Sequence, residues 1–125
     1  MPIIDFKKEL LDLEDNPITQ NKFGKPNENG NVKYEGQETI TLGLIALSSL
    51  LNLSEKDKSL SGKERFERYQ LSVKIQKSMT DNEPLEMVSE EITLIKEQIG
   101  DKNEPLKVGP AWDLLENKKE DIEVN

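Results

Sequence analysis

A single apolar run, residues 42–53, limits the possible folds of this chain more than any other part of the sequence. The run reads Leu-Gly-Leu-Ile-Ala-Leu-Ser-Ser-Leu-Leu-Asn-Leu and contains no charged side chain. Thr39 or Thr41 is placed to cap a helix that begins near Leu42. Because this helix is apolar almost all round, we expect either the central buried helix of the domain or a helix partly covered by a second subunit.

Away from this run the chain is polar and acidic. Of its 125 residues, 34% are apolar and 34% are charged, and 17 basic against 25 acidic side chains give a net charge of −8. These values predict one small domain with a modest core, spanning residues 1–116. The acidic balance argues against nucleic-acid binding, since few counterions would be released from a phosphate backbone. The apolar run is shorter than the roughly 20 residues of a membrane span, and the N-terminus does not resemble a secretion signal, so we expect an intracellular protein.

The chain contains neither cysteine nor histidine. This absence excludes thiol nucleophiles, disulfides, histidine general bases and the usual zinc ligand sets. The acidic residues fall in clusters typical of solvated or capping positions, and the alternating acids of residues 12–16 are followed by Pro17, which does not fit a calcium loop. Gly24, Gly30 and Gly36 lack the Lys-Ser/Thr that follows a phosphate-binding loop. We therefore predict no catalytic, cofactor-binding or metal-binding residues.

The N-terminal third is predicted to contain a short strand and a long polar arm. Within residues 3–18, Leu11 and Leu13 alternate with acids, which favours a strand, although helical spacing also fits part of this segment. Residues 19–38 are rich in Gly and Asn and predict a hairpin or loop with Asn29-Gly30 at its tip. Because loops of this length in a small domain are usually functional or disordered, this arm is the first candidate for contact with a partner.

The second half of the chain is predicted to be helical. Residues 54–60 are interpreted as a polar connector, and Ser61 and Glu64 form a capping-box pattern for a helix that runs to about Ser78. This helix has two nearly opposite apolar stripes, so it needs two neighbours. The stripes are Phe66, Tyr69 and Val73 on one side, and Leu71, Ile75 and Met79 on the other.

Two further helices are predicted after the turn at residues 80–84. Ser89 is the expected cap of the first, and Gly100 is its expected left-handed stop. Residues 106–108 are predicted to be extended, and Pro110 is expected in the first turn of a last helix from Ala111 to about Asn117. The remaining residues, 117–125, are predicted to be a flexible acidic tail.

Trp112, the only tryptophan, is interpreted either as an anchor that fixes the last helix to the core or, together with Leu115, as an interface residue. Other candidates for an interface lie on the arm and on the apolar helix. The possible interface residues are Phe23, Tyr34, Leu44, Leu47, Leu51, Trp112 and Leu115.

The order of several short motifs resembles a small uncharacterised protein family of tailed bacteriophages and prophages, over roughly residues 8–116. The motifs are the turn at residues 15–18, Thr41-Leu42-Gly43, residues 60–69, Val88 to Ile92, Leu94 to Lys96, Ile99-Gly100 and residues 108–116. Segment 19–38 is longer than the usual turn of that group. The resemblance implies a phage origin and a location in the cytoplasm of the bacterial host or in the virion, and it supplies no catalytic residues that could be carried over to this chain.

These observations predict an α+β domain, mostly helical, with about four helices and a small N-terminal β-hairpin. We expect a non-enzymatic phage protein that contacts itself or another phage protein, with no nucleic acid or membrane as partner, and that acts in virion assembly as a possible homo-oligomer. The alternative is a host-directed inhibitor or regulator whose acidic surface binds a basic surface of a bacterial protein. An enzyme that uses carboxylates and an exogenous metal is the third and least favoured hypothesis.

Overall fold

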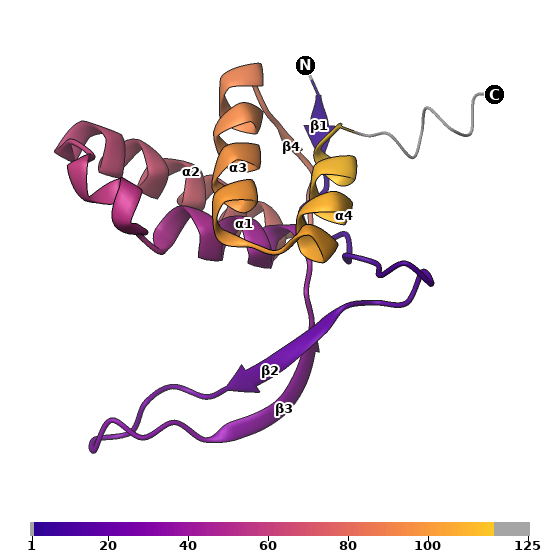
Figure 1. Cartoon of the computed structure of the whole chain (residues 1–125), viewed down its shortest axis with the longest axis vertical. Helices are drawn as coiled ribbons and strands as arrows, with labels where there is room; N and C mark the ends of the chain where they lie inside the picture. The colour runs from indigo at the N-terminus through magenta and orange to yellow at the C-terminus, as the bar shows by residue number, and fades with distance from the viewer. Residues whose placement is uncertain (1, 117–125) are drawn as a thin grey trace.

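The computed structural model describes residues 2–116, and the tail predicted for residues 117–125 lies outside this range. Within the described part of the chain, four α-helices, one 3-10 helix and two pairs of short antiparallel strands confirm the mostly helical α+β fold (Figure 1). The elements, in chain order, are β1 (Ile3–Ile4), β2 (Thr19–Phe23), β3 (Tyr34–Thr39), α1 (Leu42–Leu51), η1 (Glu55–Ser59), α2 (Gly62–Asp81), β4 (Leu85–Glu86), α3 (Ser89–Lys102) and α4 (Pro105–Glu116).

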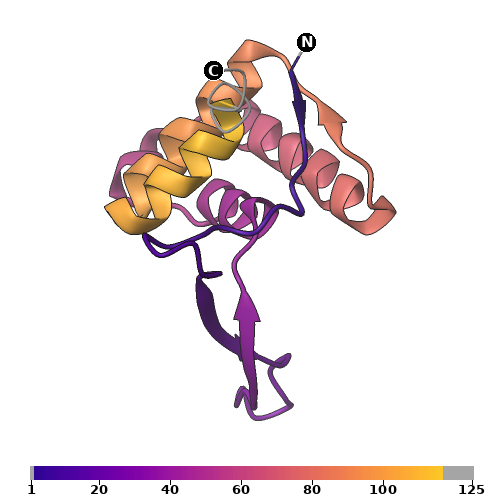
Figure 2. The ribbon, with the colours of Figure 1, turned by 90° about the vertical axis from the view of Figure 1, so that its right-hand side faces the viewer.

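Helix α1 lies at the centre of a helical body and contacts α2, α3 and α4. The hairpin of β2 and β3 projects away from this body as an arm (Figure 1, Figure 2). Strand β1 pairs with β4, with Ile3 opposite Glu86 and Ile4 opposite Leu85. The core is formed by buried side chains from the N-terminal segment, the end of the arm and all four helices: Ile4, Phe6, Leu10, Ile40, Leu42, Ile45, Ala46, Leu50, Leu71, Ile75, Met87, Ile95, Ile99, Ala111 and Leu115.

The apolar run forms the buried central helix that its composition predicts. Thr41 is the cap, since its hydroxyl accepts a hydrogen bond of 3.2 Å from the Leu44 backbone N–H. The helix ends at Leu51 rather than at Leu53, because Asn52 takes an extended backbone conformation. The first of the two expected roles, burial in the core, therefore applies to most of α1.

The predicted hairpin is present, and neither of its faces is buried. Strands β2 and β3 are antiparallel, with Phe23 opposite Tyr34. At the tip, Gly30 takes a positive φ of 82°, and the Asn27 side chain accepts hydrogen bonds from two backbone N–H groups. Every residue of β2 is exposed, as are half of those in β3. The arm thus receives little support from the core.

The strand predicted around Leu11 and Leu13 is wrong. Leu11 forms only an isolated bridge with Pro17, and the strand of this region lies earlier, at β1. Leu13 is 89% exposed. The physical reason is the Asp12 side chain, which accepts hydrogen bonds from the backbone N–H groups of Glu14 and Asn16 and so stabilises a turn.

Helix α2 begins at the predicted capping box and extends to Asp81, three residues beyond the predicted end. Ser61 and Glu64 exchange side-chain to backbone hydrogen bonds at 3.1 and 3.2 Å. Asn82 stops the helix in the left-handed conformation. Only the stripe that contains Leu71 and Ile75 packs on the core. Within residues 2–116, the neighbour expected for the opposite stripe is not found.

The predicted ends of α3 are wrong. The cap is Val88 rather than Ser89, because the Glu91 side chain accepts a hydrogen bond of 3.1 Å from the Val88 N–H. Gly100 lies inside the helix, which continues to Lys102. A Cβ atom at Gly100 would lie 3.3 Å from the Trp112 ring, so this glycine allows close packing of α4.

The extended segment predicted at residues 106–108 is also wrong, because α4 already begins at Pro105. Both Pro105 and Pro110 fit the first turn of a helix, and the earlier proline occupies it. The Glu104 carbonyl accepts hydrogen bonds from the backbone N–H groups of Lys107 and Val108, in the first turn of the helix. Helix α4 remains continuous across Pro110. Two of the helix residues after this proline, Ala111 and Leu115, are buried. Their burial stabilises a helix that an internal proline disfavours.

Candidate functional site

A groove of about 390 Å³ lies between α1, the base of the arm and the junction of α3 with α4. Its apolar part comes mainly from α1, and Ile40 adds to it at the end of the arm. Gln20, Asn103 and Lys107 supply polar groups at the same groove. An apolar centre with polar neighbours is typical of a surface that binds another molecule.

Three of the candidate interface residues line this groove: Leu44, Leu47 and Leu51. Their spacing places them on one face of α1. Leu44 and Leu47 are half-buried, and Leu51 is 54% exposed. The part of α1 that the core leaves uncovered is therefore apolar.

Two further candidates, Phe23 and Tyr34, lie together on the arm. Their ring centroids are 5.9 Å apart at an angle of 66°, which is an edge-to-face arrangement. Both rings are more than half exposed, and Val32 beside them on the arm is 50% exposed. The rings contact each other across the two strands and leave most of their surface open to a partner.

The last two candidates, Trp112 and Leu115, belong to the packing of α4. Leu115 is buried in the core. The Trp112 Nε1–H donates a hydrogen bond of 3.1 Å to the Lys96 carbonyl, and the Lys96 Nζ lies 4.6 Å from the centroid of the indole ring. With Gly100 below the ring, these contacts describe an anchor between α3 and α4.

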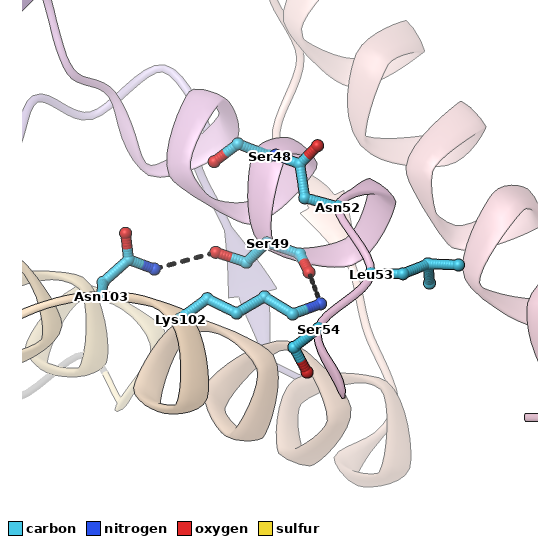
Figure 3. Close-up of a pocket in the computed structure, with 7 residues that line it drawn as sticks. All are labelled: Ser48, Ser49, Asn52, Leu53, Ser54, Lys102 and Asn103. Atoms are coloured by element: carbon cyan, nitrogen blue, oxygen red, sulfur yellow. Dashed lines mark hydrogen bonds between the residues drawn. The ribbon is translucent and has the colours of Figure 1, made fainter. Parts of the chain in front are cut away.

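A second, smaller cavity of about 230 Å³ lies at the C-terminal end of α1 and is mostly polar (Figure 3). Lys102 extends below α1, and its Nζ donates a hydrogen bond of 2.6 Å to the Ser49 carbonyl. The Asn103 side chain donates to the Ser49 hydroxyl at 3.0 Å. The Lys102 ammonium and the Asn103 amide thus donate hydrogen bonds to Ser49, near the C-terminal end of α1, where the helix dipole is negative.

Beside this cavity, Asp57 of η1 is held between two cations. Its carboxylate lies 3.1 Å from Arg68 Nη1 and 3.0 Å from Lys102 Nζ, and all three side chains are at most 11% exposed. The Ser54 backbone N–H is the largest cause that lowers the pKa of Asp57 far below its ordinary value. Burial acts in the opposite direction, and Lys102, the Ser54 hydroxyl and Arg68 lower the pKa further. A carboxylate held ionised in this way is suited to joining η1, α2 and α3 and not to proton transfer.

Sequence reasoning misses this cluster because the composition of residues 54–60 indicates a polar connector. A signal was available, since Ser54 and Asp57 have the spacing of a capping box. In the structure the Ser54 N–H lies 2.8 Å from the Asp57 carboxylate, and the Ser54 hydroxyl donates a hydrogen bond of 3.1 Å to the same carboxylate. The roles of Arg68 and Lys102 could not be inferred, because they depend on how distant helices pack.

Among residues 2–116, no group of three or more acidic side chains is arranged to hold a metal ion. None of the helices in the same range combines the length and apolar character needed to cross a bilayer. Searches for related proteins found no matching family model, no matching curated protein and no matching solved structure.

Proposed function

We propose that this chain is a non-enzymatic protein that acts through protein–protein contacts made by its arm and its α1 groove. The partner is a second copy of the chain or another protein of the same phage, and the setting is assembly of the virion. The observation that carries the proposal is an arm with both faces exposed, which projects from a body with an apolar groove at the arm's base (Figure 2).

The physics of small sheets supports this proposal. An isolated two-stranded hairpin is only marginally stable in water. Here the arm presents two open strand edges and the exposed rings of Phe23 and Tyr34. Open edges can accept a further strand, and exposed aromatic rings are the most common anchors of interfaces. A partner that covers the arm would supply the contacts that the core does not.

The distribution of acids supports a role without catalysis. Within the described residues, Asp57 is the only buried acidic residue. Its charge is already compensated by Arg68 and Lys102. General acid–base chemistry with carboxylates usually requires two groups in different environments. The buried charge of this chain instead connects secondary-structure elements.

The test is light scattering behind size exclusion, across micromolar concentrations, combined with affinity capture from cells that produce the phage. We expect a self-associated species or one stoichiometric phage partner. Tyr34→Ser and Leu51→Ser are expected to weaken that association by about tenfold or more. Leu106→Ser, which removes a leucine of similar exposure outside the groove, is the matched control.

A chain that stays monomeric and captures no phage protein contradicts the proposal. So does an association that Leu106→Ser weakens as much as Leu51→Ser does. Thermal unfolding of each variant shows whether a loss of association reflects a loss of folding.

A second candidate function is the inhibition or regulation of a host protein with a basic surface. It is supported by a stretch of exposed acids within residues 81–97, in which the single basic residue, Lys96, is half-buried and pairs with Glu116. The exposed acids of this stretch are Asp81, Glu83, Glu86, Glu90 and Glu97. One stoichiometric, salt-sensitive partner captured from uninfected host cells supports inhibition, whereas a partner found only in infected cells supports assembly.

A further inference from the structure

The outer face of α2 is a second surface that the fold leaves without a neighbour. It consists of Phe66, Tyr69 and Val73, which are 57%, 57% and 48% exposed. Their spacing places them on one side of the helix, nearly opposite Leu71 and Ile75, which pack on the core. Helix α2 forms one flank of the helical body, on the side away from α4 in both views (Figure 1, Figure 2).

The aromatic side chains of this outer face are already arranged for contact. The Phe66 and Tyr69 rings are stacked, with centroids 6.1 Å apart and an angle of 21° between the ring planes. Stacking restricts both side chains before any partner arrives, which reduces the entropy lost on binding. Exposed aromatic clusters of this kind are unusual on a free surface and typical of interfaces.

The charge around this face is opposite to that of the rest of the chain. Helix α2 carries five Lys and Arg against three Asp and Glu, in a chain with a net charge of −8. Lys63, Arg65 and Lys77 lie on the same half of the helix as the aromatic stripe. Among residues 2–116, neither Lys63 nor Lys77 forms an ion pair.

The charges also decide against pairing of α2 with the α2 of a second copy. In an antiparallel pair centred on the stripe, Lys63 would face Lys77 of the other copy, and like charges in these positions repel. In a parallel pair, the basic positions would face neutral ones. The face therefore suits a partner with acidic residues beside its apolar contact.

We propose that the outer face of α2 binds an acidic amphipathic helix of another protein. The apolar residues of that helix would pack on Phe66, Tyr69 and Val73, and its flanking carboxylates would pair with Lys63 and Lys77. A helical partner is favoured because the stripe runs along one side of a 20-residue helix, and a second helix can pack its own apolar stripe against it. This surface is separate from the arm and groove, so the proposal stands independently of the function proposed above.

The experiment uses the full chain labelled with ¹⁵N and a synthetic helical peptide with Leu at heptad positions a and d and Glu at e and g. A second peptide, in which each Glu is replaced by Lys, is the matched probe. We expect saturable chemical-shift changes along the outer face of α2 with the acidic peptide, an affinity that falls with added salt, and no such changes with the basic peptide.

Variants locate the contact. Lys63→Glu combined with Lys77→Glu is expected to weaken binding of the acidic peptide by about tenfold, as two ion pairs become repulsive. Lys22→Glu combined with Lys33→Glu makes the same change of net charge on the arm and is expected to leave binding unchanged. Phe66→Ser combined with Tyr69→Ser is expected to abolish binding without unfolding the chain, since both rings are more than half exposed.

Several outcomes overturn the proposal. One is the absence of saturable shifts at millimolar acidic peptide, and another is equal binding of the two peptides. Shift changes confined to the arm or groove also overturn it. Concentration-dependent shifts of α2 without peptide would show a second copy as the occupant. Stronger binding of α2 to phosphatidylserine vesicles than to the peptide would show a membrane as the occupant.

Discussion

Asp57 is the residue whose replacement is expected to cost the most stability, because Arg68 and Lys102 both depend on it for charge compensation. Breaking a buried ion pair leaves an uncompensated charge and costs about 3–5 kcal/mol. We predict that Asp57→Asn lowers the free energy of unfolding by about 3 kcal/mol. This is the lower end of the range, because the cluster borders an open cavity and is not fully enclosed by protein. Glu55→Gln, an exposed acid on the same 3-10 helix, should change it by less than about 0.5 kcal/mol. Urea denaturation measures both, and equal effects would refute the assignment.

The same carboxylate makes stability depend on pH on the acid side. The pKa of Asp57 is lowered in the folded chain, whereas an unfolded aspartate titrates near pH 3.9. The unfolded state therefore binds the proton first, so the stabilisation is present above about pH 4 and is lost as the pH falls further. We expect the wild-type free energy of unfolding to decline more steeply below about pH 4 than that of Asp57→Asn. Parallel curves would contradict this prediction.

Single-residue roles could be predicted where they are local and not where they depend on packing. Ser61 and Glu64 cap α2 as their spacing predicts. Trp112 forms the anchor that was one of its two predicted roles. The spacing from Ser54 distinguishes Asp57 from Glu55 locally. The ion pairs of Asp57 with Arg68 and Lys102 could not be predicted, because they depend on how distant helices pack.

At the scale of elements, side-chain caps predict the starts of α1 and α2, whereas Gly100 and Pro110 predict wrong boundaries for α3 and α4. The start of α1 follows from Thr41, which is adjacent in sequence. The end of α3 does not follow from Gly100, because the Trp112 ring explains that glycine. Likewise, Pro110 is compatible with a helix start in isolation, but the packing of α4 extends the helix back to Pro105.

Two glycines in helices are expected to respond in opposite directions to substitution by alanine. A Cβ atom at Gly43 would lie 2.1 Å from the Met79 Sδ and 3.0 Å from the Phe6 carbonyl oxygen, and the backbone oxygen cannot move freely. We predict that Gly43→Ala lowers the free energy of unfolding by about 1–3 kcal/mol through overpacking, despite the higher helix propensity of alanine.

Gly62 at the start of α2 is the matched control, because a Cβ atom there meets nothing within 4 Å and no proline follows it. Gly62→Ala should raise the free energy of unfolding by up to about 1 kcal/mol, since alanine restricts the unfolded chain and favours the helix. Urea denaturation compares the two variants. If both alanine variants raise the free energy of unfolding, the close approach of Gly43 to the Phe6 carbonyl is contradicted.

At the scale of the whole molecule, the helical body is expected to fold without the outer part of the arm. Because β2 is exposed throughout, replacing residues 23–34 by a short Asn-Gly turn removes few contacts. We predict that the free energy of unfolding changes by less than about 0.5 kcal/mol, and that self-association or partner capture is lost. A large fall in stability would show that the arm is a structural part of the domain.

The fold class could be predicted because one apolar run and three further helical patterns leave few alternatives. The placement of those helices could not. The two stripes of α2 predict two neighbours, yet within residues 2–116 only one stripe is covered. Periodicity shows that a face is apolar, and it does not show whether the same chain covers that face.

The pairing of β1 with β4 has a consequence for how the chain matures during translation. Ile3 and Ile4 find their strand partners only at Glu86 and Leu85, and Phe6 is fully buried beside them in the core. A nascent chain still attached to the ribosome can form the hairpin and α1 early, because those contacts are local. Residues 3–6 are synthesised well before β4 and therefore reach their final positions late, and their apolar side chains stay open to chaperones until β4 emerges.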